Sequence, residues 1–135
     1  MTRIQRAVLA SGAGLVLAWA PASAHHSFSA EFDERRPITV SGCVTKVEWM
    51  NPHMHFYMDV RDANGKVTNW DFELGSPNAL MHEGWTRSSL KIGDEVTVQG
   101  YRAKDGSNLV NAKTVKLANG QNVFGASSAP DAGAH

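Results

Sequence analysis

The fold is decided by residues 53–74, HMHFYMDVRDANGKVTNWDFEL, because two strand patterns flank a turn there. In the first half, Met54, Phe56, Met58 and Val60 alternate with polar residues. This alternation is typical of a strand with one face in a core and the other in solvent. The second half repeats it with Trp70, Phe72 and Leu74. The stretch therefore predicts a hairpin of two strands that share one apolar face.

The register of this hairpin follows because both apolar faces must point to the same core. That condition is met when three pairs lie opposite each other: Asp59 with Asn69, Tyr57 with Asp71, and His55 with Glu73. It leaves residues 63–65, Ala-Asn-Gly, as a three-residue loop, whose last position favours a left-handed glycine. A two-residue Asn-Gly loop would put the apolar side chains of the two strands on opposite faces.

The strand before the hairpin is expected to be long and bent. From Ile38 onward, residues of one face follow at every second position up to Val44, and the apolar phase then slips by one residue to Val47. A slip of this kind near a glycine, here Gly42, predicts a β-bulge, which bends a strand around a small barrel. Asn51-Pro52 ends this strand.

After the hairpin, a short helix and two further strands are predicted. Ser76 can cap the helix, Pro77 suits its first turn, and Gly84 can end it. Strands are expected at residues 95–101 and 109–117, with a short edge strand at Val123-Phe124.

This order of elements predicts the fold class. Three strands, a helix and two strands, with a bent first strand, match an OB-type Greek-key barrel. We therefore expect an all-β protein with one short helix: a small OB-type five-stranded barrel with the helix between strands 3 and 4. A small open β-sandwich is the alternative.

The N-terminus carries the pattern of an export signal. Arg3 and Arg6 precede an apolar run over residues 7–20, Pro21 breaks the run, and Ala22-Ser23-Ala24 fits a cleavage site. The run is shorter than the roughly 20 residues that a permanent membrane helix needs. Residues 1–24 are therefore expected to be a cleaved Sec-type signal peptide, which places the mature protein in the periplasm without a permanent membrane span. An uncleaved membrane anchor is the alternative.

The remaining chain divides into three predicted parts. Residues 25–37 are expected to form an extended arm, residues 38–124 the OB-like domain, and residues 125–135 a disordered tail rich in Ala, Ser and Gly. The chain has 13 Lys plus Arg and 13 Asp plus Glu residues, and loss of Arg3 and Arg6 would leave it slightly acidic. Such a charge balance gives no general attraction to nucleic acid or anionic lipid. Cys43 is the single cysteine, so an internal disulfide is impossible.

Histidine placement indicates a candidate metal site. His53 and His55 leave the same face of a strand, and Glu73 lies opposite His55 in the predicted register. Imidazole and carboxylate groups suit a borderline divalent metal such as Zn(II), Cu(II) or Ni(II). Cleavage after Ala24 would make His25 the first residue, whose α-amino and imidazole nitrogens can chelate copper, with His26 beside it. The predicted metal ligands are thus His25, His26 and His53, with His55 and Glu73 as helpers.

Structural readings of the same histidines stay open. His25 and His26 can be a solvated chain end, and His53 can brace the turn after Asn51-Pro52. His55 and Glu73 can form an ordinary cross-strand pair. Phosphate-loop, zinc-protease and nucleophile-elbow motifs are absent from the sequence, which favours a non-enzymatic role without deciding it.

Two functions follow most directly from these observations, and a small metal-dependent enzyme is a third alternative. The first is a periplasmic binding module for a transition metal, copper or zinc. The second is a protein–protein accessory domain for an exported enzyme or envelope complex. Nucleic-acid binding is not expected, because Phe56, Trp70 and Phe72 face the predicted core and the mature chain is slightly acidic. The remaining candidates for exposed stacking groups are Trp49, Tyr57 and Trp85.

Several short motifs also resemble one family. They are His-His-Ser-Phe at 25–28, Val-Thr-Lys-Val-Glu-Trp at 44–49, Asn-Pro-His at 51–53, Gly-Ser-Pro-Asn-Ala-Leu at 75–80 and Gly-Trp-Thr-Arg at 84–87. The sequence resembles, from about His25 to Phe124, a family of short secreted bacterial proteins known only as a domain of unknown function. The resemblance implies an exported single domain and no particular activity.

Overall fold

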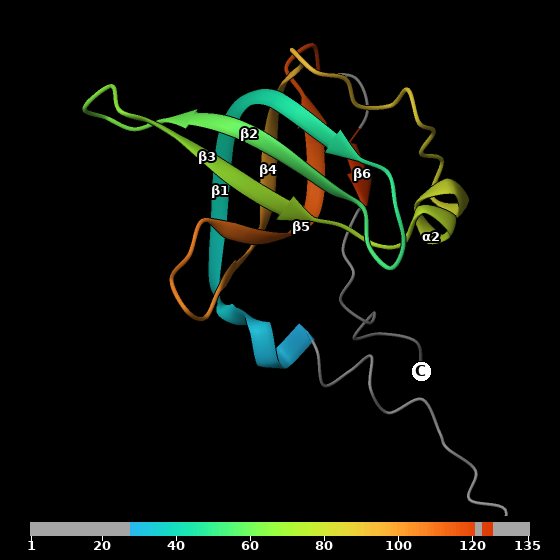
Figure 1. Ribbon diagram of the computed structural model, residues 1–135, viewed down its shortest axis with the longest axis horizontal. Helices are drawn as coiled ribbons and strands as arrows, with labels where there is room; N and C mark the ends of the chain where they lie inside the picture. Colours follow the sequence, from blue (N-terminus) through green and yellow to red (C-terminus); the bar gives the residue numbers. More distant parts are fainter. Residues whose placement is uncertain (1–27, 121–122, 126–135) are drawn as a thin grey trace, which may run out of the picture.

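The computed structural model describes residues 28–120 and 123–125, and these residues are mostly β (Figure 1). The elements are β1 (Phe32–Glu48), β2 (His55–Arg61), β3 (Val67–Glu73), α2 (Pro77–His82), β4 (Glu95–Ala103), β5 (Leu109–Leu117) and β6 (Val123–Gly125). A short helical turn at residues 28–31 precedes β1. This described part of the chain therefore contains a sheet and two short helical segments.

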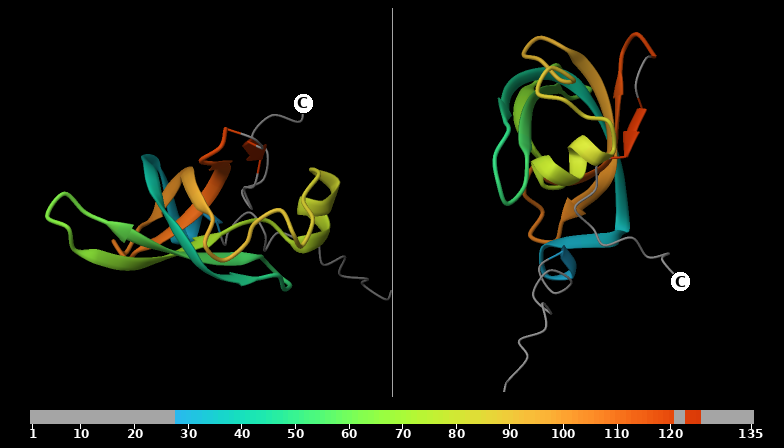
Figure 2. Two further views of the ribbon diagram at one scale, coloured as in Figure 1. Left: turned by 90° about the horizontal axis from the view of Figure 1, so that it is seen from above. Right: turned by 90° about the vertical axis from the view of Figure 1, so that its right-hand side faces the viewer.

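All six strands belong to one sheet, in the order β3-β2-β1-β4-β5-β6. Neighbours in this order are antiparallel. An additional parallel pairing joins β3 to β5, so the five longer strands form a closed ring of pairings. Figure 2 shows these strands winding around one interior, with α2 near one of its ends.

The predicted hairpin register is confirmed. Tyr57 pairs with Asp71 and His55 with Glu73 in the β2–β3 ladder, which continues to Arg61 and Val67. A hydrogen bond from the Asp62 N–H to the Lys66 carbonyl (2.9 Å) then closes the three-residue loop. Gly65 ends the loop with a φ of 81°, the left-handed conformation that the register required.

The predicted bulge in the first strand is also confirmed. The register of β1 against β2 shifts between Val44 and Lys46, so Thr45 is the extra residue. The Thr45 side chain forms two hydrogen bonds with neighbouring strands. Its Oγ1 donates to the Tyr57 carbonyl (3.3 Å) and accepts from Asn69 Nδ2 (3.0 Å). The shift lets the apolar residues on both sides of Thr45 face the same interior.

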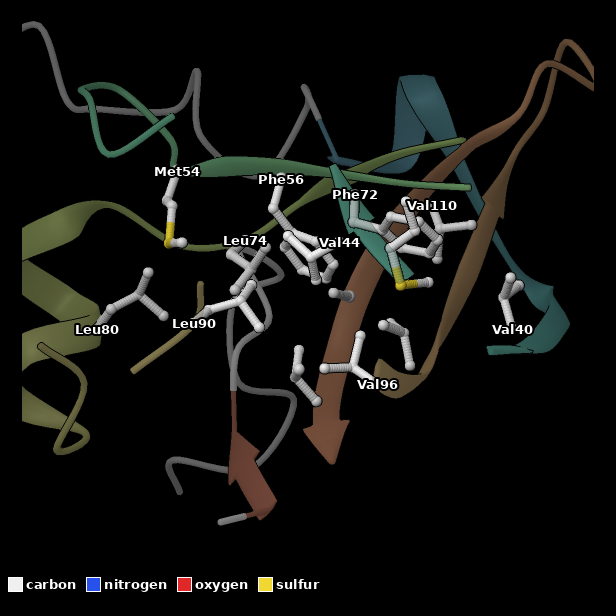
Figure 3. Packing of buried hydrophobic residues seen from close by; sticks show 14 of the residues in the cluster. Val40, Val44, Met54, Phe56, Phe72, Leu74, Leu80, Leu90, Val96 and Val110 are labelled. Atoms are coloured by element: carbon white, nitrogen blue, oxygen red, sulfur yellow. The ribbon is translucent and has the colours of Figure 1, made fainter. Parts of the chain in front are cut away.

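The interior of the ring is the main hydrophobic core (Figure 3). Phe56 and Phe72 stack at its centre with ring centroids 5.1 Å apart, and both are fully buried. At the end of the core next to α2, Leu80 of that helix packs with Met54 and Leu74. Val60 and Trp70, which were expected in the core, are only partly buried and pack against its edge.

The helix lies where the sequence placed it, between β3 and β4. Ser76 caps it, because its Oγ accepts a hydrogen bond from the Ala79 N–H at 3.2 Å, and Pro77 occupies the first turn. Gly84 has a φ of 95° just beyond the helix end. Leu80 and Trp85 are buried, so this segment closes one end of the core.

The segment expected to be an extended arm up to Pro37 differs from that expectation. Residues 28–31 are helical, and β1 begins at Phe32 rather than at Ile38. The physical reason is a second, small hydrophobic cluster, formed by Phe28, Phe32 and Ala103. One helical turn brings Phe28 and Phe32, four positions apart, to the same side, where their rings lie 5.5 Å apart.

The predictions for the chain ends fall largely outside the described residues. The segment predicted to be a signal peptide (residues 1–24), His25, His26 and the predicted tail from residue 126 all lie outside the described residues. Gly125, expected in the tail, ends β6 instead. Within the described residues, no helix has the length and apolar character needed to cross a bilayer.

Candidate functional site

The candidate site is the outer face of β1, β2 and β3, which we define by the side chains that alternate with core residues. On β2 and the residues before it, Met54, Phe56 and Met58 are buried, so the side chains between them point outward. The polar members of this outer face are Lys46, Glu48, His53, His55, Tyr57, Asp59, Asn69, Asp71 and Glu73. His53, His55 and Glu73, which the sequence predicted to lie together, are therefore on one face, and Asp71 lies there too.

Each histidine on the outer face is bound to one carboxylate. The Nδ1 atom of His55 lies 2.7 Å from Asp71 Oδ1, and the Nδ1 atom of His53 lies 3.2 Å from Glu73 Oε1. These contacts are diagonal: the backbone of His55 is opposite Glu73, but its ring reaches Asp71. The alternative of a simple His55–Glu73 pair is thus replaced by two parallel His–carboxylate pairs.

The pairing leaves the second ring nitrogen of each histidine available. No described residue forms a hydrogen bond with Nε2 of His53 or His55. The two side chains are 37% and 26% exposed, so both rings are accessible from solvent. In metal sites, a ligating histidine commonly uses one ring nitrogen for the metal and donates the other N–H to a carboxylate.

Charge on the outer face favours protonation of His55. Its pKa is raised, first by the hydrogen bond to Asp71 and then by the negative charges of Asp71, Glu73 and Glu48, while burial opposes the shift. Burial is also the first cause that raises the pKa of Tyr57, and the charges of Asp71 and Glu48 add to it while Lys46 opposes the shift. The face is therefore a region of negative potential that attracts cations.

A second group of contacts borders the histidines. The Tyr57 hydroxyl donates to Glu48 Oε2 (3.2 Å), and the Lys46 ammonium forms an ion pair with Glu48. The Lys46 Nζ atom also lies 5.0 Å from the centroid of the Tyr57 ring. Glu48 is the residue paired with His55 across β1 and β2, so these contacts hold a third carboxylate next to the imidazoles.

The described side chains do not complete a conventional metal site. In residues 28–120 and 123–125, no three His, Cys, Asp or Glu side chains are arranged to hold one metal ion. His53, His55 and Glu73 are brought together, whereas the other two predicted ligands, His25 and His26, lie outside the described residues. His82 is the last residue of α2 and does not belong to the β2–β3 ladder.

The sequence missed the roles of Asp71 and Glu48. Asp71 was placed on the correct face but was not assigned to a histidine, because backbone register gives only directly opposed pairs. The right-handed twist of strands brings diagonal neighbours within reach, and this is the signal that could have suggested the contact. Glu48 was not singled out, because its neighbour across β1 and β2 depends on the extra residue at Thr45.

A separate hollow lies beside the bend of β1. It has a volume of about 600 Å³, and its lining includes Ser41, Cys43, Asp59, Arg61 and Glu95. The Cys43 thiol is exposed there. Neither His53 nor His55 lines this hollow, so it is distinct from the outer-face histidines.

The fold and the outer face define a small, mostly β protein with histidine–carboxylate pairs on one side of a hairpin. The chain belongs to the family of unknown function DUF6152, whose model matches residues 13–111. The match extends through β4 into β5 and confirms the resemblance found in the sequence. No curated protein matches the chain.

Proposed function

We propose that this protein is an exported, non-enzymatic module that binds a transition metal, copper or zinc, through Nε2 of His53 and His55. The observation that carries the proposal is the pair of contacts from Nδ1 to Glu73 and Asp71. A carboxylate at Nδ1 fixes the ring, sets the tautomer and makes Nε2 a better ligand. Asp71 and Glu73 thus act as orienting groups, and Glu73 need not ligate the metal itself.

The N-terminal histidines are proposed as further ligands. Phe28 packs in the same cluster as Leu109, and Leu109 is paired with Asp71, the partner of His55. An extended chain spans up to about 3.6 Å per residue, so His25 is within roughly 11 Å of Phe28 along the chain. Signal cleavage after Ala24 would add a free α-amino group at His25. His26 is the second candidate ligand from this segment.

We also infer an OB-type barrel as the scaffold. Support comes from the bent β1, the helix between β3 and β4, and the parallel β3–β5 pairing that closes the ring. Ligands of OB-type barrels commonly bind on the face of the second and third strands, which is where the histidines lie.

Export to the periplasm is part of the proposal. It rests on the basic start, the short apolar run and the Ala22-Ser23-Ala24 motif. Membership of the family of unknown function is compatible with it and adds no activity. N-terminal sequencing of the exported protein tests this part directly, with His25 as the expected first residue.

Metal titration of the mature protein beginning at His25 tests the binding function. We expect stoichiometric binding of Cu(II) and Zn(II), weakened at least about tenfold by His53→Ala or His55→Ala and by Asp71→Asn. His82→Ala is the matched control and leaves the affinity unchanged, because His82 lies at the end of α2. Absence of binding, or equal loss in the His82 variant, would overturn the metal function and leave the accessory-domain role.

A further inference from the structure

Met50 and His53 flank the bend at residues 51–52 in the connection between β1 and β2. The β1–β2 ladder ends with Glu48 paired with His55. Both strands end at that pair, but if its antiparallel register is counted on into the connection, Trp49 falls opposite Met54 and Met50 opposite His53. Only Asn51 and Pro52 separate that last pair.

Burial supports this continuation. Trp49 packs against the core, and Met54 is 1% exposed and points into the hydrophobic cluster (Figure 3). If the alternation of β1 is counted on through Trp49, Met50 falls on the same side as Glu48, as His53 does with His55. Met50 is 55% exposed, as this position requires.

The donors already described leave the metal incompletely coordinated. Two imidazoles are available, and the described His, Cys, Asp and Glu side chains provide no group of three. A methionine thioether is a donor outside those four types. It is a soft ligand that favours Cu(I), whereas Zn(II) is bound in proteins by thiolate, imidazole and carboxylate.

We infer that Met50 is a thioether ligand that joins His53 and His55 and makes the site selective for copper in the Cu(I) state. This inference rests on the metal site proposed above. Its structural basis is the position of an exposed methionine and of an imidazole with an unengaged Nε2 on either side of the bend at residues 51–52. No redox reaction is required, because Cu(I) is the form that binds.

The test is a competition for Cu(I) against a chromogenic chelator, under reducing and oxygen-free conditions. The mature protein is compared with Met50→Leu and Met81→Leu, all in a Cys43→Ser background because an exposed thiol also binds Cu(I). Met81, in α2, is 53% exposed and is a matched control for an accessible methionine. Zn(II) affinity and circular dichroism are measured in parallel, so that a folding defect is recognised.

We expect Met50→Leu to weaken Cu(I) binding by about tenfold or more and to leave Zn(II) affinity within about twofold. Met81→Leu leaves both affinities unchanged. X-ray absorption of the Cu(I) form shows a sulfur neighbour that the Met50 variant lacks. Unchanged Cu(I) affinity in Met50→Leu, or equal loss in Met81→Leu, overturns the inference while Zn(II) binding through His53 survives. Failure of the unmodified site to bind either metal overturns the metal function as well.

Discussion

Gly42 of β1 lies so close to Asp59 of β2 that a Cβ atom on Gly42 would come within 2.4 Å of the Asp59 carbonyl oxygen. Real Cβ atoms do not approach backbone atoms so closely. Gly42 is paired with Val96 of β4 at the point where β1 also begins to pair with β2. The missing side chain therefore allows β1 to bend between its two neighbours.

Substitution of Gly42 by alanine should destabilise the protein. Asp59 is held in the β2–β3 ladder opposite Asn69, so its carbonyl cannot move away freely. We expect Gly42→Ala to lower the free energy of unfolding by about 2 kcal/mol or more, which urea denaturation measures. Gly125→Ala is the control, because a Cβ there meets nothing within 4 Å. Equal stability of the two variants would show that β1 tolerates a side chain at the bend.

The contact between His55 and Asp71 predicts a pH dependence. The pKa of His55 is raised in the folded protein, so imidazolium at this position stabilises the fold. That stabilisation is fully present below the ordinary histidine pKa of the unfolded chain and is lost as the pH rises through the folded pKa.

NMR titration of the metal-free protein checks that pH dependence. Asp71→Asn is expected to lower the pKa of His55, because the largest cause of the shift is removed. Asp59→Asn is the control, since the Asp59 carboxylate accepts from Asn69 instead. A pKa of His55 that stays raised in the Asp71 variant would assign the shift to other groups.

Phe28 is predicted to hold the start of the described chain against the sheet. Its ring is 7% exposed and contacts Phe32 and, edge-on at 6.1 Å, Tyr101. Phe28→Ala should cost about 2–3 kcal/mol, at or below the low end of the range for a core phenylalanine, because its cluster is small.

Thermal unfolding and limited proteolysis measure the effect at Phe28. Cleavage near residues 28–31 should become faster while β2 and β3 stay protected. Ile92→Ala is the control, with a side chain that is 72% exposed and an expected change below about 0.5 kcal/mol. A Phe28 variant as stable as the Ile92 variant would contradict the anchoring role.

Cys43 is predicted to react in the folded protein. Its side chain is exposed beside the bend of β1, so a thiol reagent should modify it fully without denaturant. Cys43→Ser should leave Zn(II) binding unchanged, because the hollow that Cys43 lines includes neither His53 nor His55. Slow modification that requires urea, or loss of Zn(II) affinity in the serine variant, would contradict this separation.

The parts of the fold that the sequence predicted are those set by side-chain alternation. The period of two between Met54 and Val60 requires one apolar face, and that requirement alone fixed the hairpin register. The slip between Val44 and Val47 likewise located the bulge. Both features depend on neighbours within one or two strands, which is why the local pattern sufficed.

The parts that the sequence did not predict depend on contacts between distant segments. The helical turn at 28–31 has no clear period of its own and is stabilised by Ala103 and Tyr101, more than seventy positions away in the chain. The outer face itself was predicted, but the choice of Asp71 rather than Glu73 by His55 was not. That choice depends on strand twist and rotamer, which alternation does not encode.

The parallel pairing of β3 with β5 also determines when the ring of strands can close during synthesis. Glu73 meets Asn111 only after α2 and β4 have been made. Until then, the far side of β3 and one side of β4 have no neighbour, and a growing chain offers those backbone groups to proteases and chaperones. These two strand edges therefore stay unpaired until β5, close to the end of the described chain, has been made.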